Sequence, residues 1–151
     1  MNPLQHLVDQ LENAIPKTNT FNFDVSSKQV GWHIEHSLLV INKIVASVLE
    51  SNPDHFESKF HLKRSVIFAL QIIPRGKVKA PKIVVPSGEI TSKSIQENLI
   101  LTKQYLEKLA ALKGNYFFVH PMFDKLNVKQ TEKFLYIHTK HHLKIIQDIL
   151  K

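Results

Sequence analysis

The last periodic segment of the chain, residues 135–146, carries three histidines within five residues. His138 and His142 are four positions apart, so on an α-helix their side chains lie on one face. On a helical wheel of about 100° per residue, that face also holds aliphatic side chains, while His141 falls toward the polar flank. Imidazole is the commonest metal ligand at neutral pH. A buried metal bound by His138 and His142 is the most specific explanation of the pattern, whereas hydrogen-bonded core histidines are the commoner one.

The spacing of three or four between apolar residues recurs along the chain and predicts an all-α fold. Four main helices are expected, at residues 3–14, 26–51, 92–113 and 127–150. A shorter helix or helix pair at 54–73 is followed by an irregular crossover at 74–88, which contains three prolines and two glycines. Because this crossover is long, it allows the second and third main helices to run parallel. We expect a single domain over residues 1–151.

Local signals predict the helix ends and the connections. Ser26 or Ser27 is expected to cap the second main helix, and Gly114 to lie at the C-cap of the third. Within the crossover, residues 83–85 are expected to be extended at most. A loop around His120 and Pro121 is expected before the last helix.

The composition excludes several classes of protein. The chain has no cysteine, so disulfides, thiolate zinc sites and cysteine nucleophiles are absent. No apolar run reaches the ~18 residues of a membrane span, and the first ten residues lack the basic and apolar regions of a signal peptide. We therefore expect no membrane association and a cytoplasmic location.

The formal net charge of +7 raises the alternative of a nucleic-acid partner. The lysines, however, are spread along the whole chain, and the densest basic stretch, residues 74–82, has no aromatic residue for base stacking. A solvated basic surface is therefore favoured over nucleic-acid binding.

A metal site needs more than two histidines, because catalytic zinc sites usually have three protein ligands. The second predicted helix offers His33 and His36. His33 lies at the edge of the main apolar stripe, and His36 lies near a second apolar side formed around Trp32, so periodicity slightly favours His33 and does not decide between them. The segment 138–142 has no glutamate between its outer histidines, so it is not the H-E-x-x-H zinc-protease motif.

Three segments carry a family resemblance: residues 30–38, residues 120–123 with the helix 137–146, and the basic, proline-bearing stretch 75–81. In order, separation and helical context they resemble the DinB/YfiT-like superfamily, in its domain-of-unknown-function branch, over nearly the whole chain. The resemblance implies a four-helix bundle with a long crossover between the second and third main helices. It also implies a divalent metal, with zinc or nickel expected, bound by His36, His138 and His142; His33 remains the fallback for His36.

One position departs from the family pattern. The family's loop often reads His-Pro-x-Phe-Gly, whereas Asp124 occupies the glycine position here. A glycine at that place can serve a positive φ, which Asp tolerates better than most residues.

The resemblance implies either a metal-dependent hydrolase or a thiol S-transferase, acting on a small-molecule or thiol substrate. Four further residues are candidates to line the pocket or to contact the ligands: His33, His120, His141 and Glu35. Glu35 could act as a base, but a surface charge on the helix is the favoured role. The alternatives are a non-catalytic, metal-stabilised binding or stress-associated bundle, and a basic nucleic-acid-binding protein. Because the second helix is apolar on two sides, we also predict a homodimer contact.

Overall fold

The computed structural model describes residues 2–76 and 80–151, and these residues are mostly helical. The elements in chain order are α1 (Pro3–Asn13), η1 (Ile15–Lys17), α2 (Val30–Glu50), η2 (Pro53–His55), α3 (Leu62–Leu70), η3 (Lys82–Val84), α4 (Ser92–Ala111), β1 (Phe117–His120), β2 (Asp124–Asn127) and α5 (Val128–Ile149). The three η elements are single 3₁₀ turns. Within the described ranges, no helix is long and apolar enough to cross a membrane.

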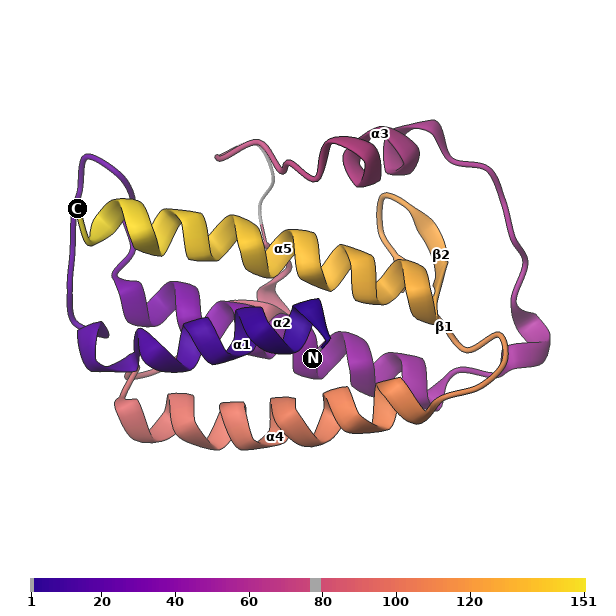
Figure 1. Ribbon diagram of the computed structural model, residues 1–151, viewed down its shortest axis with the longest axis horizontal. Coiled ribbons are helices and arrows are strands. Elements are labelled where there is room, and N and C mark those ends of the chain that lie inside the picture. The colour runs from indigo at the N-terminus through magenta and orange to yellow at the C-terminus, as the bar shows by residue number, and fades with distance from the viewer. Residues whose placement is uncertain (1, 77–79) are drawn as a thin grey trace.

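The four longest helices lie side by side, with α2 packed against both α4 and α5, and α1 packed against α5 (Figure 1). Two hydrogen bonds show how α2 and α4 run. Asn98 donates to Glu35, and Thr102 donates to Asn42, so residue numbers rise together along both helices. The two helices are therefore parallel, as the long crossover between them allows, while α1 and α5 run the other way (Figure 1).

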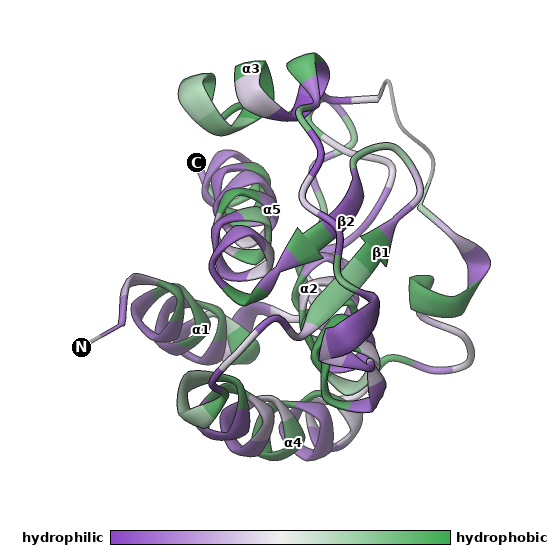
Figure 2. Ribbon diagram, turned by 90° about the vertical axis from the view of Figure 1, so that its right-hand side faces the viewer, coloured by the Kyte–Doolittle hydropathy of each residue, from purple (hydrophilic) through white to green (hydrophobic). Residues whose placement is uncertain are grey.

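The core forms where the apolar faces of these helices meet. A view along the helices shows the hydrophobic segments turned toward one another (Figure 2). Ile34, Leu38 and Ile41 of α2 are fully buried, and so are Ile95 of α4 and Leu135 of α5. The uneven apolar pattern of α2 follows from this position, because α2 contacts a neighbour on more than one side.

A β-hairpin precedes α5, where only a loop around His120 and Pro121 was predicted. The strands pair antiparallel, from Phe117 opposite Asn127 to His120 opposite Asp124. Each strand has only four residues, which is too short for an alternating pattern to stand out in the sequence. Asp124, the first residue of β2, has φ 60°, a positive value that Asp tolerates better than most residues.

Three local predictions were wrong. The second main helix begins at Val30 with Gln29 as its N-cap, and no side chain caps it. Neither Ser26 nor Ser27 is at the N-cap, and the Oγ atom of Ser26 contacts His33 instead. The third main helix ends at Ala111 with Leu112 as an extended C-cap, so Gly114, at φ 98°, lies beyond the cap. Residues 82–84 form a 3₁₀ turn rather than an extended stretch.

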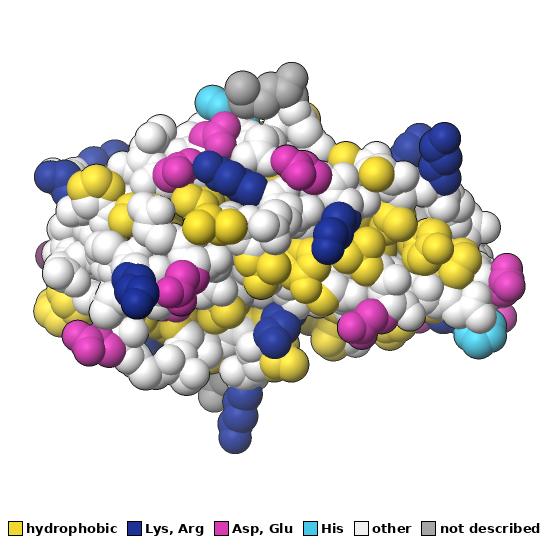
Figure 3. All heavy atoms as spheres, turned by 90° about the horizontal axis from the view of Figure 1, so that it is seen from below, with side chains coloured by type: hydrophobic (Ala, Val, Ile, Leu, Met, Phe, Trp, Pro, Cys, Tyr) yellow, Lys and Arg dark blue, Asp and Glu magenta, His cyan; other side chains and the backbone are white. Residues whose placement is uncertain are grey.

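The surface is basic without a concentrated patch on the face that Figure 3 shows. There, Lys and Arg side chains stand apart from one another, with Asp and Glu between them, around a band of apolar side chains. This distribution is consistent with a solvated basic surface.

Candidate metal centre

Three histidines from two helices meet inside the molecule, and we call them the three-histidine group: His36 of α2, and His138 and His142 of α5. Each offers one ring nitrogen, and these nitrogens lie within 4.8 Å of one another. The ring centroids are 5.2 Å apart for His36 and His138, and 4.7 Å apart for each of the other two pairs. His36 and His142 are buried, and His138 is partly buried.

The orientation of these side chains has a different cause on each helix. His138 and His142 are one helical turn apart on α5, so their common direction follows from the helix itself. His36 comes from α2, and its ring is held in place by contacts outside the helix. The Nδ1 atom of His36 lies 2.7 Å from the carbonyl oxygen of Val84 in η3, and Trp32 stacks on the ring with centroids 4.9 Å apart.

The bond to Val84 decides which nitrogen of His36 is free. A carbonyl oxygen can only accept, so Nδ1 of His36 carries the proton and donates it. The neutral ring then has a lone pair on Nε2. A metal-binding histidine usually donates its other ring nitrogen to a carbonyl, a carboxylate or water. His36 therefore has the hydrogen bonding of a metal ligand.

His138 supplies the clearest indication that the group fits an ion. Its Nδ1 atom is buried and has no hydrogen-bond partner among the described residues. A buried polar atom without a partner costs about 1–3 kcal/mol. A tetrahedral Zn²⁺ with Zn–N bonds of about 2.0–2.1 Å would place its nitrogens roughly 3.3 Å apart, which small side-chain adjustments can reach from the present spacing.

All three rings are neutral at physiological pH. Burial, with smaller contributions from neighbouring histidines, lowers the pKa of His138 to about 3. Burial likewise lowers the pKa of His142 and of His36, although the hydrogen bond to Val84 acts in the opposite direction on His36. Because a histidine must be neutral to bind a metal, the site is ready to do so without first losing protons.

His33, the fallback ligand, lies beside the three-histidine group and not within it. It is only 4% exposed. Its Nδ1 atom is 3.0 Å from Nδ1 of His142, and its Nε2 atom is 3.0 Å from Oγ of Ser26. His33 thus contacts a candidate ligand instead of replacing His36.

His141 lies on the flank of α5, as the helical wheel predicts, and is half-buried. Burial lowers its pKa, and the nearby Arg75 lowers it further, while the backbone of Ile73 raises it. Arg75 also forms an ion pair with Asp148 at 2.8 Å, so this part of the crossover is attached to α5. His141 lies near this part of the crossover and is outside the three-histidine group.

His120 is part of the hairpin. Its ring stacks on Phe123 with centroids 4.4 Å apart, and its Nδ1 atom accepts a hydrogen bond from the backbone of Met122. The ring of Phe134 lies 4.6 Å from His120 and 6.0 Å from His138. His120 therefore contributes to the turn and to the packing near His138, and it does not reach the three-histidine group.

Glu35 turns toward α4. It is buried, at 8% exposure, and accepts a hydrogen bond from Asn98. Burial raises the pKa of its carboxyl group. The expectation of a plain surface charge was wrong for this residue, and the structure does not bring its carboxylate into the three-histidine group.

Sequence reasoning missed two contributors to the site, Ser26 and the carbonyl of Val84. Neither has a spacing signal, because both lie in connections whose path depends on the packed helices. The spacing of four between Trp32 and His36 places both on one face of the helix, but only the structure shows that the two rings stack.

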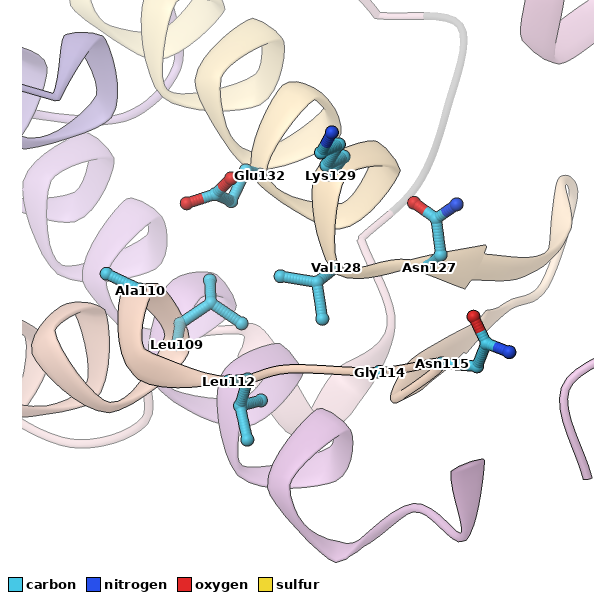
Figure 4. Close-up of a pocket in the computed structure, with 9 residues that line it drawn as sticks. All are labelled: Leu109, Ala110, Leu112, Gly114, Asn115, Asn127, Val128, Lys129 and Glu132. Carbon is cyan, nitrogen blue, oxygen red and sulfur yellow. The ribbon is translucent and has the colours of Figure 1, made fainter. Parts of the chain in front are cut away.

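A separate groove of about 480 Å³ lies between the end of α4 and the start of α5 (Figure 4). Leu109 and Leu112 line one side of it, and Val128 and Glu132 line the other. No histidine lines this groove, so it is distinct from the three-histidine group.

Comparisons of the chain with protein-family models, with curated proteins and with solved structures give no match.

Proposed function

We propose that this protein binds a divalent metal ion, zinc or nickel, through His36, His138 and His142, as a four-helix bundle of the DinB/YfiT-like type formed by α1, α2, α4 and α5. The observation that carries the proposal is that one ring nitrogen from each of three neutral histidines lies within 4.8 Å of the others. In addition, the buried Nδ1 atom of His138 has no hydrogen-bond partner among the described residues. The sequence resemblance of residues 30–38, 120–123 and 137–146 to that superfamily points to the same ligand set.

The proposed activity is metal-dependent hydrolysis or thiol S-transfer on a small-molecule substrate. A divalent ion bound by three imidazoles supplies Lewis-acid chemistry at a position that stays open to water or to a thiol. The chain's own residues hold the ligands: Val84 orients His36, and Trp32 covers its ring. His138 is partly buried, whereas His36 and His142 are buried.

A non-catalytic, metal-stabilised bundle is the second candidate. It is favoured by the origin of the ligands, because α2 and α5 pack directly against each other and an ion would join them. It also fits the absence of a carboxylate from the three-histidine group among the residues that the structure describes. A substrate screen with hydrolase and thiol-transfer substrates separates the two candidates.

The experiment that tests metal binding is elemental analysis of protein purified without a histidine tag. We expect about one zinc or nickel ion per chain in the wild type and none in His138→Ala. His6→Ala is the matched control, because His6 also lies on a helix but is exposed. It should retain the metal. Wild-type protein that stays metal-free after incubation with zinc and with nickel would contradict the proposal.

A further inference from the structure

A continuous chain of hydrogen bonds leads from His142 to the loop before α2. Nδ1 of His142 lies 3.0 Å from Nδ1 of His33, and Nε2 of His33 lies 3.0 Å from Oγ of Ser26. The same Oγ atom accepts a hydrogen bond from the backbone N–H of Lys28 at 3.1 Å. Both ring nitrogens of His33 are therefore used.

Proton counting limits this chain to two arrangements. A neutral imidazole has one N–H donor and one acceptor nitrogen. In the first arrangement, Nδ1 of His142 donates to His33, and Nε2 of His33 donates to Ser26. In the second, the direction is reversed: Ser26 donates to His33, His33 donates to His142, and His142 carries its own proton on Nε2.

The two arrangements have opposite consequences for a metal. In the first, Nε2 of His142 has a free lone pair. In the second, a proton occupies Nε2, and Nδ1 of His142 is taken up by His33, so the ring offers no nitrogen to an ion. Only the first arrangement is compatible with His142 as a ligand. In it, Ser26 accepts two hydrogen bonds, one from His33 and one from Lys28.

The surroundings hold His33 in one place. Its ring is 4% exposed and packs edge-on against Trp32, with centroids 5.2 Å apart. His33 and His36 are also three residues apart on α2. The same helix therefore holds both the residue that contacts His142 and the candidate ligand His36.

We propose that His33 is a positioning residue, which with Ser26 holds His142 with its proton on Nδ1 and its Nε2 lone pair turned toward the three-histidine group. This inference rests on the proposed metal site. It assigns a role to two residues that are not themselves ligands. Contacts of this kind commonly contribute about 10–100-fold to metal affinity.

The test compares three variants by zinc affinity, measured in competition with a chelator. His33→Phe keeps the ring volume and removes both nitrogens, and we expect it to weaken binding by about 10–100-fold. His33→Asn keeps an acceptor oxygen near the position of Nδ1, so it should recover most of that loss. Ser26→Ala leaves the contact between the two histidines intact, and we expect it to weaken binding by only a few fold, roughly less than 10-fold.

A second measurement needs no metal. Long-range ¹H–¹⁵N correlation spectra of the metal-free protein distinguish a protonated from an unprotonated ring nitrogen. We expect wild-type His142 to carry its proton on Nδ1, and this preference to weaken in His33→Phe. Circular dichroism of each metal-free variant checks that it is folded; if His33→Phe is not, Ser26→Ala and His33→Asn provide the comparison.

Several outcomes would overturn the inference. Zinc affinity unchanged in His33→Phe would show that the contact does not matter, and equal losses in the Phe and Asn variants would assign the effect to packing. A wild-type protein that binds no metal contradicts the proposed function instead. In that case the ¹H–¹⁵N spectra of the metal-free protein still test the inference. A proton on Nε2 of His142 would overturn it.

Discussion

His36 and Val84 are 48 residues apart in the chain, and their Nδ1 and carbonyl oxygen atoms lie 2.7 Å apart. This bond connects the crossover to the three-histidine group. The crossover therefore has a second role beyond allowing α2 and α4 to run parallel, because its 3₁₀ turn η3 sets the orientation of a candidate ligand.

Shortening Val84 should weaken the site without touching a ligand. Val84 is buried, and Val84→Ala removes about 1–3 kcal/mol of packing free energy that holds η3 against α2. We expect a loss of thermal stability and a several-fold loss of zinc affinity, roughly 3–10-fold, because the carbonyl becomes less well placed. Ile83→Ala is the control, since Ile83 is 68% exposed and should change neither quantity. Equal effects of the two substitutions would contradict this role for Val84.

The single tryptophan should report metal binding. Trp32 stacks on His36 at an interplanar angle of 16°, so an ion on that ring would be close to the indole. We expect Ni²⁺ to quench the tryptophan fluorescence in a saturable way, and added Zn²⁺, which has a filled d shell, to restore it by competition. His138→Ala should abolish the saturable phase. Quenching that persists unchanged in this variant would place the ion elsewhere.

Acid should destabilise the metal-free protein because its buried histidines resist protonation. Burial lowers the pKa of His33 and His120 to about 4, and of His138 to about 3, from the ordinary 6.5. In the unfolded chain these histidines therefore bind protons near pH 6.5, whereas in the folded chain they remain neutral at that pH. The stability from these neutral histidines is fully present above pH 6.5 and is lost as the pH falls toward 3.

Urea unfolding of metal-free protein between pH 7.5 and pH 5 measures this dependence. Each such histidine adds a slope of about 1.4 kcal/mol per pH unit below 6.5. His138→Phe, which cannot take up a proton, should show a shallower slope than the wild type. A free energy of unfolding that stays constant over this range would contradict the predicted burial of the histidines.

Removing the buried guanidinium of Arg64 should loosen α3. Arg64 is 8% exposed and donates hydrogen bonds to the backbone carbonyls of Lys59, Phe123 and Lys125. Arg64→Ala leaves these acceptors without their donor, and we expect a loss of about 2–3 kcal/mol in the free energy of unfolding. The neighbouring Lys63 is exposed, so Lys63→Ala should stay within about 0.5 kcal/mol of the wild type. Hydrogen exchange should speed up in α3 and in the hairpin, and unchanged exchange there would argue against this role.

The mostly helical fold could be predicted because the long helices have strong periodic patterns. The last helix was expected at residues 127–150 and extends from Val128 to Ile149, with a capping box between Asn127 and Gln130. The hairpin before it could not be predicted. Its pairing joins Phe117 to Asn127 across a turn, and neither four-residue strand has an alternating pattern long enough to recognise.

The sequence by itself determined that His138 and His142 lie together, because a helix places residues four apart on one face whatever surrounds it. It did not decide between His33 and His36. Both lie on α2, which is apolar on two sides, so its rotation relative to α5 is set by packing and not by its own pattern. The tertiary structure decided this point. It brings His36 into the three-histidine group and hydrogen-bonds it to the carbonyl of Val84, and it places His33 in contact with His142, outside that group.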